Sequence, residues 1–178
     1  MKIRVDDIKD KEIRLAAEES LNNYPALLEL SSARECEFLS PINVELVVLR
    51  EYDHIRVNGR VETTVRLSCS RCLAEFDANV KSLFTLFYNK TSGLPLEEEQ
   101  ELTETDLDSA SYEGDYIDFT AEISEQVLME IPFKPLCKED CSGLCSNCGA
   151  DLNTVDCGCS HTETNLKFAA LKNFKVIK

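Results

Sequence analysis

The chain has 178 residues, of which 43% are hydrophobic, and it carries a formal net charge of −14. This length allows one domain, or one domain with a small appendage, and the charge disfavours a general nucleic-acid binder because Lys and Arg supply most of that affinity. No apolar run approaches the roughly 18 residues of a membrane-spanning helix, and the first residues lack the apolar core of a signal peptide, so we expect a cytoplasmic protein without a membrane partner.

The first forty residues predict a mixture of short elements. Alternation of apolar and polar residues predicts a strand over residues 1–7, and residues 34–40 are a candidate for another. Between them, residues 9–30 favour a helix that ends before Pro25, because apolar side chains recur at helical spacing: Ile13, Ala17, Leu21 and Tyr24.

Three longer strands are predicted next, over residues 42–50, 54–67 and 73–88, where β-branched and aromatic residues alternate with polar ones. Asn58 and Gly59 form a hairpin signal inside the second of these strands. We interpret them as a β-bulge instead, because a hairpin there would leave a very short first arm.

Residues 91–112 interrupt this pattern and predict a mobile acidic loop. The stretch 91–133, which contains the loop, holds 13 acidic and no basic residues. The simple interpretation of the loop is a solvated connection. The alternative is an acidic docking segment for a basic partner.

After the loop, residues 116–119 predict a short strand and residues 121–130 a helix capped by Thr120. Pro132 and Pro135 end this helix and lead the chain into its cysteine-rich part. A last helix is predicted over residues 165–174, and no internal repeat is found.

These elements predict an α+β fold, in which a curved antiparallel β-sheet carries a packed helix and is followed by a C-terminal, zinc-ribbon-like segment rich in cysteine. We divide the chain into an α+β domain, residues 1–133, and a segment 134–178 that holds most cysteines and the last helix. We expect the second part to pack on the first.

Nine cysteines dominate the chemistry of the sequence. Six of them are closely spaced near the C-terminus: Cys137, Cys141, Cys145, Cys148, Cys157 and Cys159. Cys69 and Cys72 form a separate C-x2-C pair far upstream. Disulfides are not expected in a reducing compartment. A C-x2-C turn, in contrast, supplies two of the four soft ligands of a tetrahedral zinc ion. Gly149 and Gly158 allow the sharp turns that such a site needs. We therefore predict structural zinc.

The preferred arrangement has two zinc sites. One is local and groups Cys145, Cys148, Cys157 and Cys159. The other joins two distant parts of the chain, so that metal binding would contribute to folding: Cys69, Cys72, Cys137 and Cys141. A single site that mixes the two sets, or ordinary buried thiols, are the alternatives. Cys36 is assigned to the core or the surface.

Catalysis is disfavoured. A redox C-x2-C normally opens a helix, whereas Cys69 and Cys72 lie between predicted strands. Catalytic zinc usually has His or carboxylate ligands. We assign His54 to a turn, and His161 to solvent or to the role of a substitute ligand. The sequence has no phosphate-binding glycine loop and no nucleophile elbow, so a thiol redox protein or sensor is the rival class.

Several motifs occur in a specific order: L-S-C-S-R-C-L at 67–73, E-I-P at 130–132, P-L-C at 135–137, C-S-G-L-C-S-N-C-G at 141–149, L-N at 152–153 and C-G-C at 157–159. With these motifs the chain resembles the YceD-like family, the large ribosomal RNA subunit accumulation proteins of bacteria and plastids. The resemblance implies a non-enzymatic role in making or keeping this RNA, beside a small zinc-binding protein of the large subunit. It implies no catalytic residue. Some members lack the distal cysteines, which agrees with two separable sites.

Two mechanisms fit this implied role. In one, basic side chains near the cysteines contact large-subunit ribosomal RNA or its precursor particle: Arg71, Lys134, Lys138 and Lys167. In the other, the acidic surface holds a basic ribosomal protein until delivery. Charge slightly favours the second mechanism, because residues 91–133 contain no base. Neither mechanism needs a small-molecule substrate.

Overall fold

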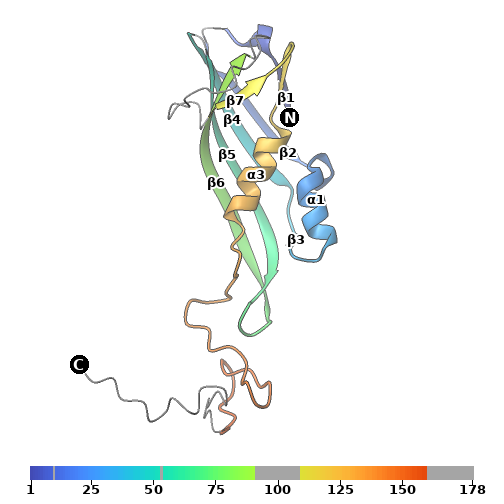
Figure 1. Cartoon of the computed structure of the whole chain (residues 1–178), viewed down its shortest axis with the longest axis vertical. Coiled ribbons are helices and arrows are strands. Elements are labelled where there is room, and N and C mark those ends of the chain that lie inside the picture. Colours follow the sequence, from blue (N-terminus) through green and yellow to red (C-terminus); the bar gives the residue numbers. More distant parts are fainter. Residues whose placement is uncertain (10, 53, 91–108, 160–178) are drawn as a thin grey trace, which may run out of the picture.

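The computed structural model describes residues 1–9, 11–52, 54–90 and 109–159. In these residues the chain has the predicted α+β fold: helices pack on a curved, mostly antiparallel sheet, and the cysteine-rich segment follows at one end (Figure 1). The strands are β1 (Lys2–Arg4), β2 (Ile13–Glu19), β3 (Glu37–Phe38), β4 (Ile42–Glu51), β5 (His54–Ser68), β6 (Glu75–Lys90), β7 (Ser109–Tyr112) and β8 (Tyr116–Asp118). The helices are α1 (Pro25–Ser32) and α3 (Thr120–Glu130), with 3-10 turns η1 (Val5–Asp7) and η2 (Leu21–Asn23).

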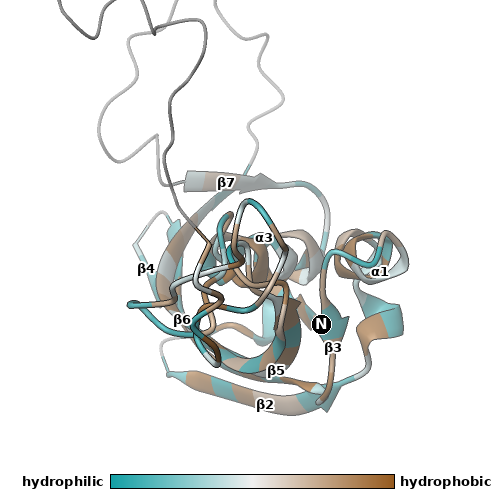
Figure 2. Cartoon of the chain, turned by 90° about the horizontal axis from the view of Figure 1, so that it is seen from below, coloured by the Kyte–Doolittle hydropathy of each residue, from teal (hydrophilic) through white to brown (hydrophobic). Residues whose placement is uncertain are grey.

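The centre of the sheet is the long hairpin of β5 and β6, which pair without a break from His54↔Asn89 to Ser68↔Glu75. β4 pairs on the other side of β5, and the sheet order is β2-β4-β5-β6-β7. Side chains alternate along β4 and β5 between a buried and a more exposed face, as the period of two in the sequence predicts. Figure 2 looks along the strands and shows the sheet curving around α3.

The β-bulge predicted at Asn58 and Gly59 is wrong, because β5 keeps a constant register with both neighbours through these residues. The glycine is explained by packing across the strands. Gly59 lies opposite Phe84 of β6, and a Cβ atom on Gly59 would be 2.2 Å from the Phe84 ring. The aromatic ring therefore covers the glycine backbone on the inner face.

The helix predicted within residues 9–30 is also wrong. Ile13–Glu19 is the edge strand β2, in which half-buried and exposed residues alternate. Pro25 begins helix α1 instead of ending one, because proline lacks only an N–H group that the first turn does not use. The strand predicted over 34–40 is reduced to β3, which pairs with β5.

Part of the predicted acidic loop is a strand. Ser109–Tyr112 forms β7, which pairs in parallel with the end of β6. The remainder of the loop, residues 91–108, and the last predicted helix, residues 165–174, lie outside the described residues. None of the described helices is long and apolar enough to cross a membrane.

Helix α3 covers the inner face of the sheet, and Ile123 and Val127 are fully buried there. Thr120 is its first residue and does not cap it. The side chain of Asp118 accepts hydrogen bonds from the Thr120 amide (3.2 Å) and hydroxyl (2.6 Å). The predicted strand at 116–119 is confirmed as β8, which pairs with β1 and so fixes the N-terminus beside the start of α3.

Candidate metal centres

The tip of the β5–β6 hairpin is a six-residue turn, residues 69–74, that extends beyond the rest of the sheet (Figure 1). The Leu73 amide donates to the Cys69 carbonyl (2.9 Å), and the Cys69 amide donates to the Ala74 carbonyl (2.9 Å). The Arg71 amide points at the Cys69 sulfur, 3.5 Å away. These bonds fold the turn so that the first thiol of the C-x2-C pair is surrounded by backbone N–H groups.

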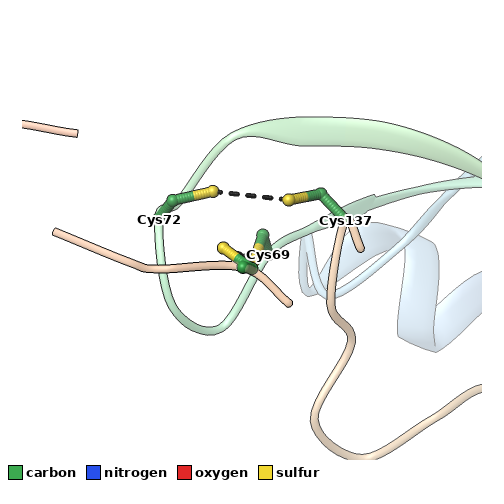
Figure 3. Close-up of side chains that lie close together, drawn as sticks. Cys69, Cys72 and Cys137 are labelled. Carbon is green, nitrogen blue, oxygen red and sulfur yellow. Dashed lines mark hydrogen bonds between the residues drawn. The ribbon is translucent and has the colours of Figure 1, made fainter. Parts of the chain in front are cut away.

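Cys137 and Cys141 meet this turn, and the four sulfurs of the first group lie within 4.8 Å of one another: Cys69, Cys72, Cys137 and Cys141. The sulfurs of Cys69 and Cys141 are 3.7 Å apart, and those of Cys72 and Cys137 are 3.6 Å apart and face each other in Figure 3. A tetrahedral zinc–thiolate site has sulfur–sulfur edges of about 3.8 Å. The spacing therefore fits one metal ion and is far too long for a disulfide.

The second group also brings four sulfurs within 4.8 Å of one another: Cys145, Cys148, Cys157 and Cys159. Its thiols are less enclosed than those of the first group. Cys145 is buried and Cys148 is exposed, whereas three members of the first group are buried. The eight cysteines thus form the two predicted groups of four, and the predicted alternative of one mixed site does not match this arrangement.

Backbone N–H groups favour one thiolate in each group. Those of Cys137 and Cys72 lower the pKa of Cys69 to about 6, and those of Cys148 and Asn147 lower the pKa of Cys145 to about 6. In contrast, burial raises the pKa of Cys137 to about 12. Each group therefore presents one thiolate near neutral pH, to which a divalent cation can bind and then displace the protons of the remaining thiols.

The two C-x2-C turns are copies of each other, although no internal repeat was predicted. The first reads C-S-R-C-L-A from Cys69, and the second reads C-S-N-C-G-A from Cys145. In the second turn the Gly149 amide donates to the Cys145 carbonyl (2.9 Å), and the Cys145 amide donates to the Ala150 carbonyl (2.8 Å), as at the first. The residue after each pair has a positive φ, +61° at Leu73 and +73° at Gly149. Four identical positions out of six were the sequence signal for this repeat.

Arg71 connects the hairpin tip to the segment that carries the second pair of ligands. Its guanidinium donates to the Cys141 carbonyl (2.8 Å), and its own carbonyl accepts from the Leu144 amide (3.2 Å). Gly143 passes so close that a Cβ atom there would be 3.2 Å from the Arg71 carbonyl oxygen. Arg71, predicted as a contact for RNA, is thus engaged in holding the first group together.

Asn153 links the two groups and was not singled out from the sequence. Its side-chain amide donates to the Cys141 sulfur (3.4 Å), and its side-chain oxygen accepts from the Ser142 amide (2.9 Å). Asp151 fixes the Asn153 amide from the other side at 2.7 Å. Asn153 belongs to the loop between the ligands of the second group but hydrogen-bonds to a ligand of the first. The only sequence signal was its place in the L-N motif.

The other predicted residues lie away from these groups or outside the described residues. Cys36 is buried in the main core, and burial raises its pKa to about 11. His54 starts β5, at the opposite end from the hairpin tip, and its ring lies 3.4 Å from a Glu51 carboxylate oxygen. Lys134 is exposed. Lys138 lies 4.0 Å from Asp140, and the remaining two, His161 and Lys167, are outside the described residues.

Comparison with known proteins supports one family. A protein of Mycobacterium leprae, named as uncharacterized, is 31% identical over 135 residues, which is 76% of this chain and 59% of the relative. The chloroplastic YCED homolog 1 of Arabidopsis thaliana, a large ribosomal RNA subunit accumulation protein, is 26% identical over 157 residues, or 76% of this chain and 49% of that protein. The homolog of the same name in Zea mays is 29% identical over 146 residues, with 67% and 49% covered.

The chain thus spans about half to three fifths of the length of these curated relatives. No solved structure matches it significantly. The family model described as large ribosomal RNA subunit accumulation protein YceD matches residues 57–175, a stretch that begins in β5 and includes both cysteine groups. The chain belongs to the YceD family of large ribosomal RNA subunit accumulation proteins.

Proposed function

We propose that this protein is a non-enzymatic, cytoplasmic factor in biogenesis of the large ribosomal subunit, required for accumulation of its RNA. The observation that carries the proposal is the match of residues 57–175 to a family named for this role. Two relatives, from Arabidopsis and maize, bear the same name. The match contains all eight grouped cysteines, so the metal centres belong to the part of the chain that defines the family.

Each cysteine group is proposed to hold one zinc ion in a structural role. Four thiolates in a tetrahedron select zinc or iron among the common metals, and a site with four protein ligands leaves no open position for catalysis. The ion would supply the charge that keeps four thiolates together. The protein residues Arg71 and Asn153 orient the ligands through hydrogen bonds to the Cys141 carbonyl and sulfur.

The cysteine-rich segment is proposed to act as one body with the α+β domain. The Ser70 amide donates to the Pro135 carbonyl at 2.8 Å, and Arg71 makes the further contacts to Cys141 and Leu144 described above. Zinc in the first group would then lock the hairpin to the chain that leaves α3. This gives the two proposed ions different tasks, attachment for one and local folding for the other.

Between the two mechanisms, the charges favour a basic protein over RNA as the direct partner. The arginines on the outer face of β5 are already paired, at 2.8 Å for Arg56 with Glu51, 2.6 Å for Arg60 with Glu62 and 2.9 Å for Arg66 with Asp77. Paired cations have little charge left for phosphates. The second candidate function is therefore an acidic chaperone for a basic ribosomal protein.

Sedimentation of the tagged protein from gently lysed cells at low salt tests the main proposal, with RNA and protein identified in each fraction. Co-migration with immature large-subunit particles, and loss of large-subunit RNA when the protein is depleted, are expected. A protein found only at the top of the gradient, free or with one basic protein, supports the chaperone instead. Unchanged large-subunit RNA after depletion contradicts both.

Metal analysis and alkylation test the zinc assignment. Native mass spectrometry of protein purified under reducing conditions should count two zinc ions, and elemental analysis should find zinc and little iron. The thiols should resist alkylation until a chelator is added. Thiols that react readily in the metal-loaded protein would favour the redox class, because reactive cysteines need an accessible thiolate.

A further inference from the structure

A groove lies beside the cysteine-rich segment and is distinct from both metal centres. Its larger half has a volume of about 480 Å³, and its lining is mostly apolar, from α1, α3 and the chain after α3. Its smaller half has a volume of about 300 Å³ and lies between the end of α1, β3 and the hairpin. The two halves share Glu35, Cys36, Leu67 and Ser68, so they form one continuous groove.

The apolar half is bordered by large side chains that nothing in the described residues covers. Phe133 is 97% exposed and lines the groove beside Leu128 and Pro132. Met129, near the end of α3, is also 79% exposed but does not line the groove. Exposed large apolar residues next to a concave surface mark binding sites, and Phe and Met are enriched at protein interfaces.

The other half of the groove is acidic. Glu35, Glu37 and Glu75 line it together with Arg34 and Arg66. The guanidinium of Arg66 is held by Asp77 at 2.9 Å and by Glu37 at 3.6 Å, which neutralises its charge. Among the described residues Glu35 and Glu75 form no ion pair, although Glu75 is close enough to Arg66 to help raise its pKa. With three carboxylates and two guanidinium groups, the lining of this half has a net charge of −1.

The backbone at the edge of the groove is held in an unusual conformation. Arg34 has φ +60° just after α1, a position at which glycine is the usual residue. The amides of Arg34 and Glu35 donate to the carbonyls of Ser31 (3.1 Å) and Leu30 (3.4 Å), which closes the helix end and fixes Glu35 at the groove. Residues other than glycine in this strained conformation cluster at functional positions.

We propose that this groove binds an extended segment of a basic protein, with an apolar side chain beside Phe133 and a Lys or Arg beside Glu35 and Glu75. The charge of the groove has the sign that such a segment needs, as does the net charge of −14 of the whole chain. RNA fits poorly, because its phosphates would face carboxylates. The proposal rests on the proposed function and specifies the class of partner within it.

Selection of random phage-displayed peptides on the zinc-loaded full-length protein tests the groove directly. The selected peptides should combine Lys or Arg with Leu or Phe. Binding should weaken at least about tenfold in Phe133→Ala and in the double variant Glu35→Lys/Glu75→Lys, because anchor residues dominate interface affinity. Leu83→Ala is the matched control, since Leu83 is 71% exposed but lies on the outer face of β6.

Selected peptides without a basic bias, or binding insensitive to both groove variants, would overturn the proposal. So would loss of binding to ribosomal RNA fragments in the same variants with peptide binding unchanged. Two other occupants of the groove would also overturn the proposal. A second copy of this chain would be detected as a dimer that dissociates in Phe133→Ala. The chain's own residues 160–178 would be detected as tighter peptide binding after the lysines within them are replaced by Ser. Association of the groove variants with large-subunit particles is measured in parallel, so a failed groove does not count against the proposed function.

Discussion

The two cysteine groups use the same turn in two different structural settings, and this difference underlies the different tasks proposed for them. The first group ties residues far apart in the sequence: the two close sulfur pairs, Cys69–Cys141 and Cys72–Cys137, are separated by 72 and 65 residues. The second group is assembled from one short stretch, residues 145–159. A cross-link that closes a long loop restricts the unfolded chain more than one that closes a short loop.

The two cysteine groups also differ in how deeply their thiols are buried. The first group is packed between the hairpin tip, Phe76 and the chain from Leu136 to Leu144. The second group has an exposed member, Cys148, and lies at the outer end of the cysteine-rich segment. The same local turn therefore occurs in two groups of four thiols that differ in their access to solvent, and the proposed ions should differ in how readily they leave.

Removal of one ligand from each group gives the largest expected difference. In the loop-entropy treatment of cross-links, closing a loop of about 65 residues stabilises the fold by about 4 kcal/mol, and a loop of about ten residues by about 3 kcal/mol. We expect Cys141→Ser to lose one zinc and to free residues 136–159 for limited proteolysis. Cys157→Ser should lose one zinc but keep the first group, which joins the hairpin tip to Cys137 and Cys141. Equal proteolysis of the two variants would show that the groups do not differ in task.

The two cysteine groups should release their zinc at different rates. A chelator in excess should remove zinc in two phases, with the fast phase from the second group because its thiols are more accessible. A difference of about 1.4 kcal/mol in opening free energy corresponds to about tenfold in rate. Absorbance of a zinc-sensitive dye follows both phases, and Cys157→Ser should lack the fast one. A single phase in the wild type contradicts the ranking.

Asn153 provides a test of coupling between the groups. Asn153→Ala removes the hydrogen bond to the Cys141 sulfur and leaves the Ser142 amide without its acceptor. Each such bond contributes about 1 kcal/mol, so the slow phase of metal release should accelerate several-fold although Asn153 lies in the loop of the other group. Thr154→Ala is the neighbouring control, because the Thr154 hydroxyl bonds only to the Asp151 carbonyl among the described residues. An effect confined to the fast phase would show that the groups are independent.

Structural features that short-range sequence patterns encode were predicted correctly, whereas features that depend on contacts between distant residues were missed. Strands β4, β5 and β6 followed from alternation, and the cysteine groups followed from spacing and from the family resemblance. The helix over residues 9–30 failed because Ile13 and Ala17 satisfy both a period of four and a period of two, and pairing of β2 with β4 decided for the strand. Gly59 was misread because its reason, Phe84, lies 25 residues away.

The residue after each C-x2-C pair offers the smallest but cleanest comparison of the two turns. Leu73 and Gly149 share the left-handed conformation. This conformation costs a residue other than glycine about 1–2 kcal/mol. Substitution by glycine recovers only part of this energy, because the greater loss of conformational entropy of glycine on folding costs about 0.5–1 kcal/mol. Leu73→Gly should therefore stabilise the zinc-loaded protein by about 0.5–1 kcal/mol. Gly149→Ala should destabilise it by a similar amount through backbone strain alone, since a Cβ there meets nothing within 4 Å.

Denaturant unfolding of the zinc-loaded variants measures both changes. Leu73 is 68% exposed, so its removal sacrifices little packing. If Leu73→Gly instead destabilises the fold, the exposed leucine makes a contact that outweighs its strain, and the two turns are not equivalent. If it stabilises the fold but weakens association with large-subunit particles, the strained leucine serves binding at the hairpin tip, and the first turn differs from its copy in function as well as in burial.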